Sequence, residues 1–211
     1  MIFALRVQGS IFKNQWSENM KALMISILIF IGVSLAAGAA DKPGDNPKVV
    51  LDTSKGKIVL ELYLQMAPET VVNFLGYVDA KFYDGTIFHR VIPNFMIQGG
   101  GFTADMQRKP GKSPIKNEAD KGLQNNRGTI AMARTGDPHS ATAQFFINSI
   151  NNDFLNHKNK TQQGWGYAAF GKVIEGMDVV DAISAVKTTK RGGFRDVPAE
   201  PVVIVTARRL K

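Results

Sequence analysis

Eight short apolar runs, each about the length of a β-strand, constrain the fold of this chain more than any other feature. Glycines and Asn/Asp clusters, which mark turns, separate the runs. They lie at 48–51, 57–63, 86–91, 95–99, 129–133, 144–148, 168–173 and 202–208. In the second run Ile58, Leu60 and Leu62 recur at every second position, so they share one face of a strand. The pattern predicts a mainly β domain.

Two other segments have the period of an α-helix. Pro68 suits the first turn of a helix, and the apolar residues after it form one stripe, made of Val71, Phe74, Leu75 and Val78. A second helix is predicted after Gly176, with an inner face made of Val179, Ile183 and Val186. Together these elements predict an all-β fold class, a closed eight-stranded antiparallel β-barrel capped by two α-helices. Periodicity alone also allows a β-sandwich.

The first forty residues indicate an export signal that precedes the folded domain. Residues 22–35 carry no charge, Lys21 stands before them, and small residues fill 36–40. This is the order of a secretory signal peptide. We therefore expect a start at Met20, cleavage near Ala39 or Ala40, a linker over 41–46 and one domain over 47–211 in the periplasm. The alternatives are an uncleaved membrane anchor, since the apolar run nears the ~18–20 residues of a span, and a cytosolic protein with a non-functional leader.

Composition and charge exclude several classes of function. The chain carries 26 Lys and Arg against 18 Asp and Glu, but the basic residues are scattered without an aromatic-basic stripe, so no nucleic-acid partner is expected. It has no cysteine, which excludes disulfides and thiolate sites. His89, His139 and His157 lack the spacing of metal ligands, and no G-x-S-x-G motif occurs. We expect no metal and no cofactor, and an enzyme of this kind would break no covalent bond.

Two segments combine polar donors with apolar residues. They are FHRVIPNFMIQGGGF at 88–102 and TAQFFIN at 142–148. At strand spacing, Arg90, Gln98 and Gln144 supply donors, whereas an apolar floor would come from Phe95, Met96 and Phe146. Taken singly, each aromatic residue could equally belong to the core, and Arg90 could form a surface ion pair. Their combination favours a binding site.

These segments resemble the two signature segments of the cyclophilin-type peptidyl-prolyl cis–trans isomerases. GYAAFGKVIEGMDVVDAI at 166–183 is similar to that family's last strand and helix, and PIKNEADKGLQNNRGTIAMAR at 114–134 resembles its Gram-negative periplasmic branch. The resemblance covers about 47–211. It implies a monomeric isomerase without a cofactor that rotates Xaa–Pro bonds during the folding of exported proteins. Its partners would be unfolded or partly folded proteins that contain proline.

The resemblance also implies roles for individual residues. It places the catalytic arginine at Arg90, whose guanidinium would donate to the nitrogen of the twisted amide. The groups that hold the substrate backbone would be Gln98, Gln144 and the main chain of Arg134. The complete set of substrate-binding residues is Phe95, Met96, Gln98, Ala133, Arg134, Gln144, Phe146, Phe154, Leu155 and Tyr167.

Some positions depart from the pattern of the family. Phe154 stands where many eukaryotic members have tryptophan, Tyr167 where they have histidine, Asn94 replaces a frequent glycine, and Arg134 replaces asparagine. Phe154 lacks the indole donor, so we expect only weak binding of the inhibitor cyclosporin. The rival interpretation is a binding module that holds proline-containing segments without turnover. Arg90 argues against it, because a pure binder gains little from a donor matched to the twisted state.

Overall fold

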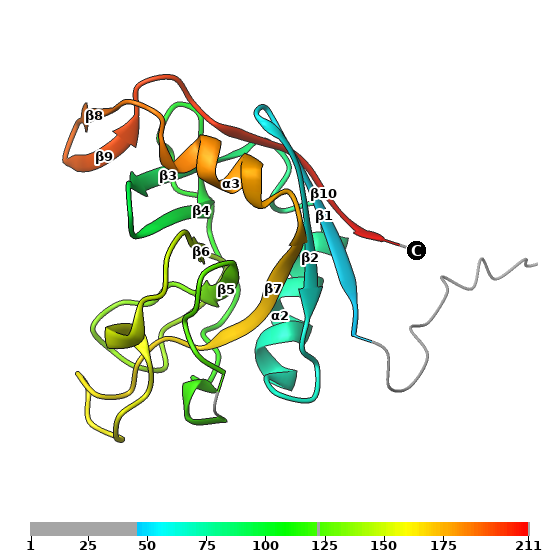
Figure 1. Ribbon diagram of the computed structural model, residues 1–211, viewed down its shortest axis with the longest axis vertical. Coiled ribbons are helices and arrows are strands. Elements are labelled where there is room, and N and C mark those ends of the chain that lie inside the picture. The colour runs from blue at the N-terminus through cyan, green and yellow to red at the C-terminus, as the bar shows by residue number, and fades with distance from the viewer. Residues whose placement is uncertain (1–45, 122, 211) are drawn as a thin grey trace, which may run out of the picture. The chain divides into compact units, whose positions relative to one another are not determined.

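The computed structural model describes residues 46–121 and 123–210, which form a closed antiparallel barrel in the strand order β1-β10-β3-β4-β6-β5-β7-β2 (Figure 1). The eight strands are β1 (Lys48–Thr53), β2 (Gly56–Leu62), β3 (Thr86–Ile92), β4 (Met96–Thr103), β5 (Thr129–Met132), β6 (Phe145–Asn148), β7 (Ala169–Glu175) and β10 (Val203–Leu210). The predicted barrel is confirmed, and the sandwich alternative is wrong. The expected export signal and the linker through residue 45 lie outside the described residues.

Two helices supply apolar side chains to the interior of the barrel: α2 (Pro68–Asp79) and α3 (Met177–Ser184). Pro68 occupies the start of α2 as predicted. The inner face of α3 differs from the expected one, because Val180 is fully buried while Val179 is only partly so. Among the described residues, none of the helices has the length and apolar character needed to span a membrane.

A carboxylate from outside α2 caps the amino-terminal end of this helix. The helix has no capping side chain of its own. Instead, the backbone N–H and the hydroxyl of Thr70 donate to Oε2 of Glu118, at 2.9 and 2.8 Å. Burial by itself would raise the pKa of Glu118, but hydrogen bonds from Lys121 and Thr70 outweigh it and lower the pKa below its ordinary value of 4.5. A negative charge at a helix start is favourable, because the unpaired amides there carry positive partial charge.

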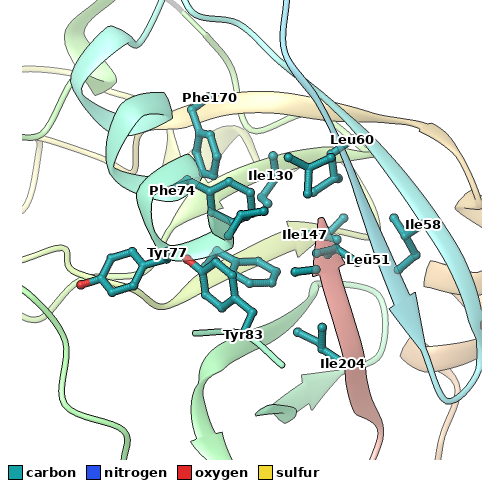
Figure 2. Close-up of a cluster of buried hydrophobic side chains, with 14 of the residues drawn as sticks. Leu51, Ile58, Leu60, Phe74, Tyr77, Tyr83, Ile130, Ile147, Phe170 and Ile204 are labelled. Carbon is teal, nitrogen blue, oxygen red and sulfur yellow. The ribbon is translucent and has the colours of Figure 1, made fainter. Parts of the chain in front are cut away.

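The centre of the core is an aromatic cluster around Phe74 of α2 (Figure 2). Its ring centroid lies 5.2 Å from that of Tyr83, 5.6 Å from Phe145 and 5.2 Å from Phe170. The hydroxyl of the buried Tyr83 donates to the carbonyl oxygen of Ala143 at 2.8 Å, so this polar group is satisfied within the core. The interior of the barrel is therefore filled, and a binding site must lie on its outer surface.

A further hairpin, β8 (Thr188–Arg191) and β9 (Phe194–Pro198), lies outside the barrel and was not predicted. Figure 1 shows it beside β3, which it contacts. The ring of Phe194 meets the ring of Phe102 edge-on at 5.1 Å. All of β8 is exposed and polar, and β9 buries only its last two residues, so the hairpin lacks the alternating buried face on which strand prediction depends. This hairpin contributes to the site described next.

Candidate active site

The alternation of side chains along β4 and β6 separates the core from a second apolar cluster on the outer face of the barrel. Ile97 and Phe145 belong to the core, whereas the neighbouring Met96 and Phe146 belong to this smaller cluster. Successive residues of a strand point to opposite faces, so one strand serves both. The same alternation that places every second residue in the barrel core therefore places the residues between them on the outside, where they form the floor of a site.

Strand register then places the polar residues beside this floor. Arg90 of β3 pairs with Gln98 of β4, and Gln98 pairs with Phe146 of β6. Directly opposed residues on neighbouring strands share a face of the sheet. Residues that are up to 56 positions apart in the sequence are therefore brought together by three adjacent strands.

A cavity of about 130 Å³, here called the inner cavity, lies over the smaller apolar cluster. Its floor is buried, with Met96 at 2%, Phe146 at 4% and Leu155 at 8% exposure. Nine of the eleven predicted site residues line it: Arg90, Phe95, Met96, Gln98, Ala133, Arg134, Phe146, Leu155 and Tyr167. The cavity combines an apolar floor with polar groups on one side, as a site for a small ring next to a polar backbone requires.

The two remaining predicted residues lie at the margins of the inner cavity. Phe154 does not line it; the residue is 62% exposed, and its ring stacks on Phe95 with centroids 5.5 Å apart. Gln144 belongs to a neighbouring cavity but joins the polar group through its side chain. Gly101 provides the space for Gln144, because a Cβ at Gly101 would lie 2.4 Å from Cγ of Gln144.

The side chains of Arg90, Gln98 and Gln144 form a chain of polar contacts. Nη1 of Arg90 donates to Oε1 of Gln98 at 3.5 Å, and Nε2 of Gln98 donates to Oε1 of Gln144 at 3.1 Å. Nε of Arg90 lies 4.0 Å from a carboxylate oxygen of Asp196 on β9. These contacts orient the guanidinium, but they are long, so its donors can still bind a ligand.

His89, next to Arg90, is buried, and its ring contacts Phe102 with centroids 4.6 Å apart. A β-bulge between Phe88 and Arg90 interrupts the alternation of the strand, so His89 and Arg90 both line the larger of the two neighbouring cavities. The pKa of His89 is lowered to about 4, chiefly by burial and further by the charge of Arg90. The ring is therefore neutral at pH 7, and it has no proton to donate as an imidazolium. Charge at this site comes from arginine.

Arg134 and Tyr167 form one rim of the inner cavity. The guanidinium of Arg134 lies 4.6 Å from the centroid of the Tyr167 ring. Its Nε donates to the carbonyl oxygen of Gly166 at 3.0 Å, and Nη1 donates to that of Thr135 at 2.9 Å. The sequence suggested only a main-chain role for Arg134. The position of its side chain could not be predicted, because two of its partners, Gly166 and Tyr167, lie more than 30 residues away in the chain.

A larger cavity of about 530 Å³, here called the outer cavity, adjoins the inner one and shares four of its lining residues: Arg90, Gln98, Ala133 and Arg134. Phe194, Arg195 and Asp196 of β9 also line it. Sequence reasoning missed these residues along with the hairpin. The pair Gly192-Gly193 between two short runs was the signal that could have found them. Within 46–121 and 123–210, no group of three or more His, Asp or Glu side chains is placed to hold a metal ion.

Comparison with known proteins gives consistent matches. The family model for the cyclophilin type peptidyl-prolyl cis-trans isomerases matches residues 48–209. The peptidyl-prolyl cis-trans isomerase cyp18 of Streptomyces antibioticus is 65% identical over 162 residues, which cover 77% of this chain and 98% of that protein. The peptidyl-prolyl cis-trans isomerase A of Dickeya dadantii is 49% identical over 195 residues, which cover 92% of this chain and 99% of that protein.

Solved structures give the same match. The crystal structure of a cyclophilin type peptidyl-prolyl cis-trans isomerase from Cryptosporidium parvum is similar with a TM-score of 0.68 at 26% identity, covering 79% of this chain and 98% of that one. A second crystal structure of the same Cryptosporidium parvum protein, determined in the presence of the dipeptide Ala-Pro, has a TM-score of 0.67 at 26% identity and covers 78% of this chain and 99% of that one.

Proposed function

The chain belongs to the family of cyclophilin-type peptidyl-prolyl cis–trans isomerases, and we propose that it accelerates rotation about Xaa–Pro bonds with Arg90 as its catalytic residue. The observation that carries this assignment is the position of Arg90. Its guanidinium lines the inner cavity, whose floor is apolar. A proline ring bound on that floor would bring its amide nitrogen close to the N–H donors of Arg90, because Arg90 and the floor residues line the same cavity.

The chemistry of the bond explains why a guanidinium suits this position. Conjugation between nitrogen and carbonyl gives the C–N bond partial double-bond character, with a rotational barrier of ~18–20 kcal/mol. In the twisted transition state the nitrogen becomes pyramidal and gains a lone pair that can accept a hydrogen bond. Arg90 is always charged and carries its donors in a fixed fork. The hydrogen bond from Arg90 to the nitrogen forms in the twisted transition state but not in the planar ground state, so it lowers the barrier to rotation.

A single hydrogen bond is not sufficient for efficient catalysis. Shortening exchange from about ten seconds to about a millisecond needs roughly 10⁴-fold, or ~5.5 kcal/mol, whereas one charged hydrogen bond contributes about 1.5–3 kcal/mol. The remainder comes from the fixed proline ring and the anchored backbone. Met96, Phe146 and Leu155 of the inner cavity would hold the proline ring. The side chains of Gln98 and Gln144 would supply donors and acceptors that anchor the substrate backbone.

The proposal extends to the cellular substrates, which would be exported proteins as they fold in the periplasm. The basic, apolar and small-residue segments before residue 41 support export. The match to the Dickeya dadantii relative covers 92% of the chain, so the similarity extends beyond residues 48–209 into the leader region.

The catalytic proposal is tested by substituting Arg90. We expect Arg90→Ala to lower kcat/KM on a short Ala-Pro peptide by at least tenfold, because the donor to nitrogen is lost. Arg90→Lys should recover part of the rate, since a point charge replaces the fork. The measurement is exchange-rate NMR, and circular dichroism checks that both variants fold. Arg90→Ala at the parental rate would contradict the assignment. A parental protein that binds the peptide without accelerating exchange would favour the binding module.

A further inference from the structure

The outer cavity carries an excess of positive charge. Four arginines line it, Arg90, Arg108, Arg134 and Arg195, together with a single carboxylate, that of Asp196. The Asp196 carboxylate lies beside Arg90, at 4.0 Å from Nε. Within the described part of the chain, no carboxylate forms an ion pair with the other three arginines. These three arginines thus line a shared space and form no ion pair with a carboxylate of the described residues.

One of these charges is held in a fixed position before any ligand binds. Arg134 stacks on Tyr167 and donates to the carbonyl oxygens of Gly166 and Thr135. It lines both cavities and so stands at their boundary. Binding a carboxylate there costs little further side-chain entropy, because the guanidinium is already ordered.

The outer cavity is continuous with the inner one, so a peptide bound at the proline reaches it. The shared residues Arg90, Gln98, Ala133 and Arg134 join the two spaces. An extended chain advances about 3.3–3.6 Å per residue, so residues a few positions from the proline fall over the outer cavity. Arg195 on β9 and Arg108 between β4 and β5 extend the positive charge away from the proline.

We propose that the outer cavity is a selectivity subsite for an acidic side chain placed near the isomerised proline in the substrate. The inference rests on the proposed isomerase function and adds a substrate class to it. Carboxylates match guanidinium groups in geometry and charge, whereas a lysine at the same substrate position meets like charges and is disfavoured. The β8–β9 hairpin thereby acts as a specificity element beside the catalytic residue.

The test is a set of blocked peptides with one Ala-Pro bond and Glu, Gln or Lys two or three residues before or after the proline. At one or more of these positions we expect kcat/KM for Glu to exceed that for Gln by about fivefold, the effect of one or two exposed ion pairs, and Lys to rank below Gln. The preference should weaken as salt is raised, because screening acts on exposed charges. Exchange-rate NMR on the full-length protein measures all peptides without a coupling protease.

Two variants assign the preference to the cavity. The double variant Arg108→Gln with Arg195→Gln should clearly lower the Glu-to-Gln ratio, although Arg90 and Arg134 retain part of the positive charge. Both residues are exposed, so the barrel should be unaffected. Lys190→Gln is the matched control: it removes a charge from the same hairpin at an exposed residue that does not line the cavity. It should keep the ratio.

The outcomes separate the two proposals. Equal rates for all peptides would overturn the subsite while leaving the isomerase assignment intact. If no peptide were accelerated, the proposed function itself would be wrong. A ratio that fell as far in Lys190→Gln as in the double variant would assign the preference to overall charge, and the subsite would again be refuted.

Discussion

Phe154 is an exposed aromatic residue whose main contact at the site is the stacked ring of Phe95. It offers an apolar face to a ligand at the edge of the inner cavity but has no hydrogen-bond donor. A ligand acceptor that meets this edge is desolvated without gaining a partner, which costs about 1–3 kcal/mol. A proline ring has no acceptor to lose, so isomerisation should depend little on such a donor.

This difference predicts a change in inhibition with little change in catalysis. We expect weak inhibition of the protein by cyclosporin and a gain of about 5- to 150-fold in Phe154→Trp, because an indole N–H then meets the inhibitor. Inhibitor titration of the isomerase rate measures it. Phe154→Leu, which also lacks a donor, is the control and should remain weakly inhibited. Equal affinity of Phe154→Trp and the parent would show that residue 154 does not occupy this edge.

At the residue scale, the sequence identified the site residues that lie within continuous motifs. Met96 and Gln98 lie two positions apart on β4, so strand alternation already places them on one face and the core residue Ile97 on the other. Phe95 lies in the turn before β4, where alternation does not apply. The stacking of Arg134 on Tyr167 could not be predicted, because the two residues approach through a loop whose path no periodic pattern records. Nor could the contact between Arg90 and Asp196, which depends on where the β8–β9 hairpin lies.

At the element scale, strands and helices with a buried face were predictable. The interior of α2 and the paired strands all carry an apolar stripe or alternation. The hairpin of β8 and β9 has no such face over most of its length. The cap on α2 escaped prediction for another reason, since Glu118 lies 48 residues beyond Thr70 and reaches it only in the folded barrel.

The Glu118 cap predicts a pH-dependent contribution to stability. The residue is buried and accepts hydrogen bonds from Thr70 and Lys121. Glu118→Gln removes the charge and brings an amide group toward these donors, so we expect a loss of about 1–3 kcal/mol, or about 2–10 °C in Tm at pH 7. The exposed Glu200 allows a matched control, Glu200→Gln, which should leave Tm nearly unchanged.

The dependence on pH follows from the direction of the shift. The pKa of Glu118 is lowered on folding, from an ordinary value of 4.5. Its stabilising effect is therefore fully present above about pH 4.5 and is lost as pH falls through the lower pKa of the folded state. The Tm difference between the parent and Glu118→Gln should shrink over that acidic range. A difference that stayed constant from pH 7 to pH 3 would contradict the charged cap.

At the scale of the whole molecule, the separation of core and site has a mechanical consequence. The barrel interior is filled by the cluster around Phe74 (Figure 2), which is separate from the small group of apolar residues under the inner cavity. In the proposed function, substrate would therefore bind to an outer face that is supported from behind by a packed core. Such a core keeps its side chains in single conformations, which holds the strand positions of Arg90, Gln98 and Phe146 fixed during rotation of the substrate bond.

We expect the amino-terminal leader to direct this domain to the periplasm. Expressed with its own amino terminus in a Gram-negative host, the protein should reach the periplasm and begin near Ala40 or Asp41, because a basic, an apolar and a small-residue segment follow one another before this point. Intact mass and amino-terminal sequencing of the periplasmic fraction measure it. Leu28→Arg puts a charge into the apolar run and should leave an uncleaved protein in the cytoplasm. Lys55→Arg, outside the leader, is the control and should be exported. A parental protein that kept residues 22–40 in the membrane fraction would mean that the segment is an anchor, and the isomerase would then act at the membrane surface.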